Sequence, residues 1–301
     1  MKPPPFEYAD PRTVAEVVSL LGRYEGDAKV LSGGQSLIPL LNMRLARPVI
    51  LVDVARIPGL DYVREENGGL AIGAMTRQRS VERSPVVKRR HPLLHAATLL
   101  ISHPQNRNQG TVGGSLAHAD PAAEYPAVAL ALDAEVRAVG PGGERAIPAA
   151  DFFVSYLTTA LEPTEVLTEV RVPALADGTG WSVREVARRH GDFALAGAMA
   201  TVALGKGNQC SAARIVLYGV GSTPLRAHQA ERMIVGEKPG ATLFEDAARK
   251  ASERIDEPLS DVHASAEYRR DLARVLTRRA LEEAAGRAAG GAAGGGTGGA
   301  R

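Results

Sequence analysis

The chain has 301 residues, a formal net charge of +2 and 45% hydrophobic residues, of which few are aromatic. This length allows two domains of ordinary size, with cores built from Ala, Val, Leu and Ile. The small net charge gives no argument for nucleic-acid binding, and the apolar runs are far shorter than the ~20 residues of a membrane span. Because the N-terminus lacks the apolar stretch of a signal peptide, we expect a cytoplasmic protein.

Cysteine and histidine usage limits the chemistry of the chain itself. A single cysteine, Cys210, excludes an internal disulfide and a four-cysteine iron–sulfur cluster within this chain. We expect Cys210 to be a strand or turn residue without a chemical role. The seven histidines show no metal-binding spacing, so no metal site is predicted.

The first part of the chain predicts a βαβ unit. A helix over 12–24 follows the start signal Asp10-Pro11. A strand is predicted at 28–31, a helix from Ser36 to about Leu45, and a strand over 49–52 that ends at Asp53. The glycine loop 32–36 lies between strand and helix, where phosphates bind. It lacks the G-x-G-x-x-G pattern, which disfavours an ordinary Rossmann site.

The following segment predicts a mixture of short helices and strands. Asn67-Gly68 is a two-residue turn signal and predicts a hairpin over 61–74. The further elements that we expect are helices over 76–83, 92–102 and 124–132 and strands near 134–139, 144–148 and 166–172. Between them, 103–124 is predicted to be a long irregular stretch, and such stretches tend to be functional.

A domain boundary is predicted at 174–180. Beyond it we expect strands at 181–188, 195–204 and 212–220, then helices near 226–235, 241–254 and 266–286, an order typical of an α+β layer. The stretch 219–224 has the composition of a dinucleotide loop, but we favour a plain strand-to-helix turn. Residues 288–301 are almost wholly Gly and Ala and are predicted to be a disordered tail.

Two glycine loops lie far apart in the sequence: Ser32-Gly33-Gly34-Gln35-Ser36 and Thr111-Val112-Gly113-Gly114-Ser115. Glycine allows a close approach of the backbone and a positive φ. Successive N–H groups in such turns form a nest that binds anions. Two nests on separate segments indicate an extended, doubly charged ligand such as a dinucleotide pyrophosphate.

These loops and their flanks resemble the flavoprotein (medium) subunit of the molybdenum hydroxylases, most closely the aerobic carbon monoxide dehydrogenase type. The similarity runs from Pro4 to about Ala285 and includes the stretches 28–39, 101–127 and 191–194. It implies an α+β fold. An FAD-binding domain of the PCMH or vanillyl-alcohol-oxidase type would cover 1–177, in parts of about 1–57 and 58–177. A smaller α+β C-terminal domain of three strands plus helices would cover 178–287.

The same resemblance implies non-covalent FAD and a set of contacts. The pyrophosphate and ribityl chain would be wrapped by Ser32, Gly33, Gly34, Gln35, Ser36 and Leu37 and by Thr111, Val112, Gly113, Gly114 and Ser115. Further contacts would come from Ile101, Leu167, Asp120, Glu124, Arg184 and Phe193. Arg184 stands where many relatives have a lysine near the flavin, and a cation there would stabilise a negative reduced flavin.

Four of these further contacts also have a purely structural interpretation. Ile101 is also what a buried helix end would carry, and Glu124 could be a favourable charge at a helix N-terminus. Arg184 could be a solvated arginine on a strand, and Phe193 could fill the core. No catalytic acid–base or nucleophile arrangement is predicted.

The resemblance implies an oxidoreductase subunit that carries electrons. FAD here would receive electrons from [2Fe–2S] clusters on a small partner subunit and pass them to an external acceptor. A large partner would hold the molybdenum cofactor and bind the substrate, in a dimer of heterotrimers. Two alternatives remain, a self-contained flavoprotein oxidase or reductase and a scaffold subunit without flavin. Gln35 stands where a covalent flavin link would need a histidine, and the intact glycines argue against a scaffold.

Overall fold

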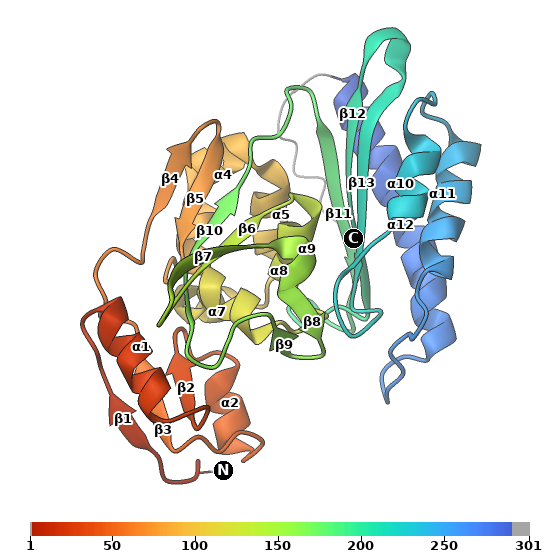
Figure 1. Cartoon of the computed structure of the whole chain (residues 1–301). Helices are drawn as coiled ribbons and strands as arrows, with labels where there is room; N and C mark the ends of the chain where they lie inside the picture. The colour runs from red at the N-terminus through yellow and green to blue at the C-terminus, as the bar shows by residue number, and fades with distance from the viewer. Residues whose placement is uncertain (1, 291–301) are drawn as a thin grey trace.

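The computed structural model describes residues 2–290, which form three main sheets in chain order (Figure 1). We call them the N-terminal, central and C-terminal sheets. The N-terminal sheet is a small unit at one end of the molecule, with α1 and α2 beside it. The central and C-terminal sheets lie side by side, with helices α5 and α8 between them.

The N-terminal sheet is parallel, in the order β1-β3-β2. Its elements are β1 (Glu7–Ala9), α1 (Val14–Arg23), β2 (Ala28–Leu31), α2 (Leu37–Asn42) and β3 (Ile50–Asp53). The Thr13 side chain caps α1 by accepting the N–H of Glu16, and Val17 of this helix is fully buried beneath the sheet. The predicted βαβ unit is confirmed. Strand β1 was not predicted, because three residues carry too short a pattern.

The central sheet has five antiparallel strands in the order β4-β5-β10-β6-β7. They are β4 (Val63–Glu66), β5 (Gly69–Gly73), β6 (Glu135–Gly140), β7 (Gly143–Pro148) and β10 (Val166–Val172). The β4–β5 hairpin is confirmed, and its turn residues Asn67 and Gly68 both have positive φ, at 50° and 78°.

Seven helices and a short hairpin connect the strands of the central sheet. They are α3 (Gln78–Arg83), α4 (Pro85–Arg90), α5 (Pro92–Leu100), α6 (Pro104–Gln109), α7 (Val112–His118), α8 (Glu124–Ala131), α9 (Ala149–Phe152), β8 (Phe153–Ser155) and β9 (Thr158–Thr159). The prediction of an irregular stretch at 103–124 is wrong, because α6 and α7 occupy most of it. Pro104 starts α6, and the Thr111 side chain caps α7 by accepting the N–H of Gly114.

The C-terminal sheet is antiparallel, in the order β11-β12-β13-β14. Its elements are β11 (Gly180–Val186), β12 (Ala196–Leu204), the short 3-10 helix η1 (Lys206–Asn208), β13 (Cys210–Tyr218), β14 (Leu225–Arg226), α10 (His228–Ile234), α11 (Ala241–Glu253) and α12 (Ala266–Ala289). The three predicted strands are confirmed, and β14 adds a fourth by pairing with the end of β13. Residues 288–289 of the predicted tail belong to α12, and 291–301 lie outside the described residues.

The C-terminal sheet has a core on each of its two faces. One face packs against α10, α11 and α12 around residues such as Ala198 and Ile215. The other face, with Met199, Val216 and Tyr218, joins the same apolar core as the central sheet. One face of the C-terminal sheet therefore closes the central core, while the other face packs against the helices of the C-terminal part.

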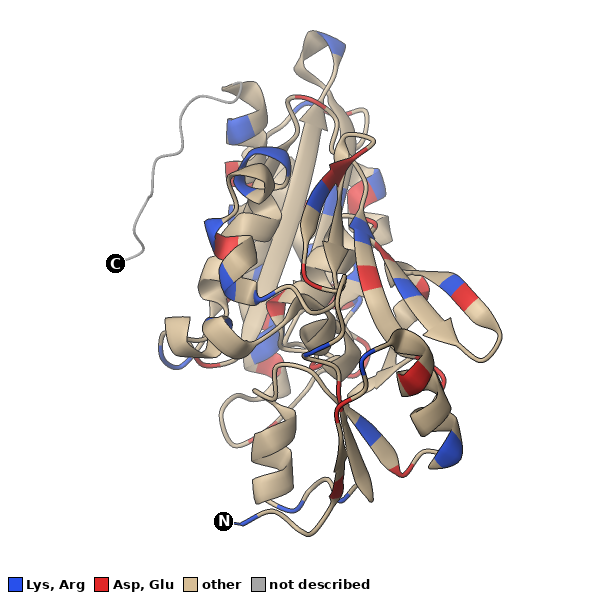
Figure 2. Ribbon diagram, turned by 90° about the vertical axis from the view of Figure 1, so that its left-hand side faces the viewer, with Lys and Arg blue, Asp and Glu red and all other residues tan. Residues whose placement is uncertain are grey.

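No helix within residues 2–290 is long and apolar enough to cross a membrane. On the outer helices of the C-terminal part, basic and acidic residues are interspersed (Figure 2). Arg249, Arg274 and Arg278 there each pair with an acidic side chain. Several arginines of these helices thus form ion pairs.

Candidate functional site

The structure brings the two glycine loops into contact. Ser32 and Thr111 are 79 residues apart in sequence, yet their hydroxyl oxygens lie 2.7 Å from each other. A side chain at Gly33 would overlap the carbonyl oxygen of Gln109, which lies just before the second loop. Glycine at position 33 therefore allows the two segments to touch.

The glycines of the two loops have different structural roles. Gly34 alone among the loop glycines has a positive φ, 71°. Gly113 and Gly114 lie in the first turn of α7, and the N–H groups of residues 112–114 already donate to Thr76, Ala74 and Thr111, so the prediction of a second nest is wrong. A Cβ at Gly113 would lie 2.8 Å from the carbonyl oxygen of Ala74, so this glycine lets α7 pack on the end of β5.

The first loop offers a row of free backbone donors. In the part of the chain that the structure describes, no protein group accepts the backbone N–H of any residue from 33 to 37. The Ser36 side chain also makes no capping bond to α2. Because unpaired backbone N–H groups need an acceptor, such a row fits the oxygens of a bound phosphate.

Side-chain amides hold the first loop in shape. Gln35 donates from Nε2 to the carbonyl oxygen of Gly33 at 3.2 Å. Asn106 in α6 donates from Nδ2 to Oε1 of Gln35 at 3.3 Å. The role of Asn106 was missed by sequence reasoning, since nothing in the pattern of α6 indicates a contact with a loop 71 residues away.

A buried arginine fixes the position of Ile101. Ile101 ends α5 and is half-buried. Arg107, only 5% exposed, donates to the carbonyl oxygens of Ile101 at 2.7 Å and Ser102 at 3.1 Å and pairs with Glu82 at 2.9 Å. Sequence reasoning missed Arg107. The available signal was a lone arginine in an otherwise uncharged stretch.

The two predicted acidic residues have different surroundings. Asp120 is half-buried, and its Oδ1 accepts the N–H of Ala122 at 2.9 Å. Glu124 begins α8 and is only 4% exposed. Burial raises the pKa of Glu124 to about 8, and the nearby charge of Glu185 adds to this rise. Glu124 is therefore not a solvated charge at a helix end. Burial disfavours its ionised form more than the helix dipole favours that form.

Leu167 and Phe193 lie in contrasting places. Leu167 in β10 is 6% exposed and belongs to the central core. Phe193 is 56% exposed on the loop between β11 and β12, so it does not fill the core. Nearby in the same loop, a Cβ at Gly191 would lie 2.7 Å from the ring of His103, which places this loop against the segment that follows Ile101.

Arg184 lies on the opposite face of the C-terminal sheet from the central core. Side chains alternate along β11, and Arg184 faces α12, where it pairs with Glu283 at 2.8 Å. Its neighbour Glu185 faces the other way and accepts the hydroxyl of Tyr218 at 2.8 Å. The predicted place of Arg184 beside the flavin is not supported, because its guanidinium points away from the other predicted residues.

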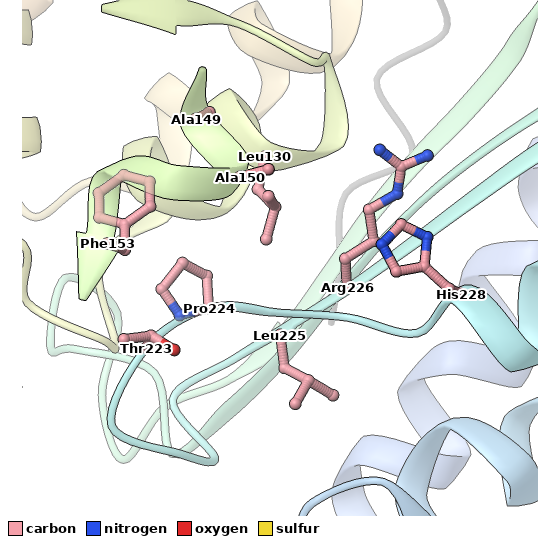
Figure 3. Close-up of a pocket in the computed structure, with 9 residues that line it drawn as sticks. All are labelled: Leu130, Ala149, Ala150, Phe153, Thr223, Pro224, Leu225, Arg226 and His228. Carbon is pink, nitrogen blue, oxygen red and sulfur yellow. The ribbon is translucent and has the colours of Figure 1, made fainter. Parts of the chain in front are cut away.

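A pocket of about 240 Å³ lies elsewhere, between α9 and β14 (Figure 3). It is lined by Leu130, Ala149, Ala150, Phe153, Thr223, Pro224, Leu225, Arg226 and His228. None of these residues belongs to a glycine loop. Arg226 already pairs with Asp133 and Glu231, and His228 contacts Glu231. The pocket therefore has no uncommitted cation among its lining residues, and we do not place the cofactor there.

Comparison with known proteins identifies the family. The model described as "FAD binding domain in molybdopterin dehydrogenase" matches residues 4–175, and "CO dehydrogenase flavoprotein C-terminal domain" matches residues 181–284. The chain is 44% identical to the 6-hydroxypseudooxynicotine dehydrogenase complex subunit alpha of Paenarthrobacter nicotinovorans, over 93% of this chain and 94% of that one. It is 43% identical to the carbon monoxide dehydrogenase medium chain of Hydrogenophaga pseudoflava, over 93% and 96%.

Solved structures agree with this result. A carbon monoxide dehydrogenase structure from Hydrogenophaga pseudoflava superimposes with a TM-score of 0.93 at 42% identity, covering 95% of this chain and 99% of that one. The predicted two-part fold and the FAD cofactor are confirmed, and the chain is an oxidoreductase subunit. The chain belongs to the family of FAD-binding medium subunits of molybdenum hydroxylases, of the carbon monoxide dehydrogenase type.

Proposed function

We propose that this chain is the electron-transfer subunit of a molybdenum hydroxylase complex. It would take electrons from [2Fe–2S] clusters on a small partner and deliver them to an external acceptor. A large partner would hold the molybdenum cofactor and oxidise the substrate. The relatives are medium chains or subunits of such complexes, and the single cysteine gives this chain no cluster of its own.

The row of free N–H groups at residues 33–37 carries this proposal. These donors, with the Ser36 hydroxyl, would hold the FAD pyrophosphate without a lysine or arginine. The N-terminus of α7, residues 111–115, would face it from the other side, where the helix dipole favours negative charge. The contact between Ser32 and Thr111 would set the distance between the loop at residues 33–37 and the N-terminus of α7.

Apolar side chains would flank the isoalloxazine. Ile101, held by Arg107, would pack on one face, and Leu167 and Phe193 would add contacts from the central core and the β11–β12 loop. Bound FAD supplies the redox chemistry, while the protein provides position, electrostatics and exclusion of water. An exposed Phe193 would be covered by such a ligand.

We also propose the division of the chain and its assembly. The FAD-binding domain would cover 1–177, with parts at about 1–57 and 58–177, and the C-terminal domain would cover 178–287. The complex would be a dimer of heterotrimers. The substrate would be recognised by the large partner, so the different substrates named for the relatives do not transfer to this chain.

A matched pair of variants tests the FAD site. Gly34 and Gly26 both have positive φ, at 71° and 97°, but only Gly34 lies in the loop. Alanine at either position strains a positive φ, and at position 34 its Cβ would also lie 3.1 Å from the Ile38 side chain, which pushes on the loop. We expect Gly34→Ala to weaken FAD binding by about 10- to 150-fold, since losing one charge-assisted hydrogen bond costs about 1.5–3 kcal/mol. Gly26→Ala should bind FAD as the wild type does. Equal FAD affinity in both variants would remove the loop from the site.

Purification from the source organism tests the subunit role. We expect a large and a small partner to copurify, with molybdenum and iron in the complex. The isolated chain loaded with FAD should be reduced by a chemical reductant, yet it should oxidise no carbon monoxide, purine or aldehyde. Turnover of any of these by the metal-free chain would overturn the proposed division of labour.

A further inference from the structure

Two carboxyl side chains from different parts of the molecule lie near the junction of the central core and the C-terminal sheet, and the charge of one acts on the other. Glu124 comes from the start of α8, and Glu185 comes from β11. Glu185 lies on the face of the C-terminal sheet that also carries Tyr218, a residue of the central core. Both residues therefore lie between the two parts, where Glu124 is buried and Glu185 is half-buried.

The structure fixes the orientation of Glu185. Tyr218 is fully buried, and its ring occupies the space that a side chain at Gly197 would take. The ring is thereby held in one position, from which its hydroxyl donates to Glu185 Oε2 at 2.8 Å. The N–H of Gly219 also donates to the carbonyl oxygen of Pro121 at 2.7 Å, which ties the loop before Glu124 to the end of β13.

Among residues 2–290, the cation that acts on Glu124 is not free to neutralise two negative charges. Arg107 lowers the pKa of Glu124, but this guanidinium is committed to Glu82 and to two backbone carbonyls. Asp120 adds a further negative charge. Tyr125, also fully buried beside Glu124, has its hydroxyl next to Thr98.

The carboxyl of Glu124 also lacks a partner outside its own residue. Within the described residues, no other residue donates a hydrogen bond to this carboxyl, and its own backbone N–H acts to lower its pKa. Burial raises the pKa of Glu124 to about 8 and the pKa of Glu185 to about 7. Two carboxylates that share a buried site do not both ionise near neutral pH, because their repulsion in a low dielectric is large.

We propose that Glu124 remains protonated in the folded protein and presents a neutral O–H donor to the FAD site, and that Glu185, oriented by Tyr218, keeps it in this state. This inference rests on the proposed function and on the sequence-based expectation that Glu124 contacts FAD; Arg107, which holds Ile101, lies close enough to Glu124 to lower its pKa. Glu185 is thus a positioning residue that acts through Glu124. A neutral donor at this place suits an anionic cofactor, whereas a carboxylate would repel it.

The dependence of FAD affinity on pH tests the donor role. If bound FAD requires protonated Glu124, Kd rises by up to tenfold per pH unit above about pH 8. Glu124→Gln keeps a neutral donor and should make Kd flat over this range. Glu185→Gln removes the repelling charge and lowers the pKa of Glu124. The pH above which Kd begins to rise, which we call the break, should therefore move to a lower value. Glu267→Gln, an exposed site in the first turn of α12, should leave the break unchanged.

The thermal stability of the FAD-free chain gives an independent readout. A carboxyl with a raised pKa in the folded state contributes stability that is present below its unfolded pKa of about 4.5 and is lost as pH rises through about 8. We expect Tm to fall over this window in the wild type and to fall less in Glu124→Gln.

The possible failures can be told apart. A wild-type chain that binds FAD with the same affinity from about pH 6 to about pH 9 would overturn the donor role alone. A wild-type Tm that falls no more than that of Glu124→Gln would overturn the protonated state of Glu124. A chain that binds no FAD at any pH would overturn the proposed function, and the donor role with it.

Discussion

Replacing Arg107 by glutamine should destabilise the segment that carries Ile101. The guanidinium is almost fully buried, pairs with Glu82 at 2.9 Å and holds the carbonyl oxygens of Ile101 and Ser102. Ser102 has a positive φ of 41°, a conformation that a side chain rarely adopts without support. Arg107→Gln removes one of the cations that pair with the Glu82 carboxylate. It also leaves the carbonyl oxygen of Ile101 or Ser102, or both, without a hydrogen-bond donor.

The expected cost follows from these contacts. Breaking a buried ion pair by removing one partner costs about 3–5 kcal/mol. Arg79 also pairs with Glu82, and its side chain is 28% exposed, so part of the charge remains compensated. We therefore expect about 3 kcal/mol. At roughly 2–4 °C per kcal/mol for a chain of a few hundred residues, Tm should fall by about 6–12 °C.

Thermal unfolding of three proteins measures this cost: the wild type, Arg107→Gln and the double variant Glu82→Gln/Arg107→Gln. The double variant should recover part of the lost stability, because it removes the carboxylate left without Arg107. A double variant as unstable as the single one would show that the orphaned carboxylate is not the source of the cost.

The pH dependence gives a second check on the same variants. Although burial acts to raise it, the pKa of Glu82 is lowered by bonds from Arg107 and Arg79. This carboxylate contributes stability that is present above its unfolded pKa of about 4.5 and is lost as pH falls through its lower folded pKa. The gap in Tm between wild type and Arg107→Gln should therefore narrow in acid. A gap that stays constant or widens would contradict the pairing.

Three further substitutions have distinct expected outcomes. Gly33→Ala should separate the two loops and weaken FAD binding by about 5- to 150-fold, the equivalent of 1–3 kcal/mol of overpacking, as measured by fluorescence titration. Gly22→Ala, where nothing lies within 4 Å, should leave FAD affinity unchanged and serves as its control. Arg287→Ala should lower Tm by about 2–4 °C, because it removes a guanidinium that lies 3.7 Å from the Trp181 ring, donates to the Trp181 carbonyl oxygen and pairs with Glu283, and an unchanged Tm would show that these contacts together contribute nothing. Gly191→Ala should push the β11–β12 loop off the ring of His103 and speed tryptic cleavage in that loop, and an unchanged cleavage rate would indicate that the contact does not hold it.

The parts of the fold that sequence predicted well are those set by local signals. The Asn67-Gly68 turn and the strand–glycine loop–helix unit both have such signals, and both are present. The helices α6 and α7 were not predicted, because their glycines and asparagines have low helix propensity. Their formation depends on a proline start, a threonine cap and the packing of Gly113 on Ala74, which only the tertiary structure shows.

The sequence predicted which loops form the candidate site. It predicted the contacts of the individual side chains much less well. The backbone donors at 33–37 follow from the glycine loop itself. The structure does not support the assignment of Arg184, because a shift of one residue along a strand reverses the face, and both faces of β11 are covered. Nothing in the local pattern distinguishes Arg184 from Glu185. Arg107 was missed because its partners are set by the packing of α3 against α6.

The apolar core shared by the central and C-terminal sheets bears on how the chain unfolds. Met199, Val216 and Tyr218 belong to the same core as the strands of the central sheet. Separating the two parts would expose this apolar face to water, at about 25 cal/mol for each Å² uncovered. We therefore expect calorimetry to show one cooperative transition for the two parts together. A fragment of residues 181–284 expressed alone would expose this apolar face of the sheet to water. We therefore expect the fragment to aggregate.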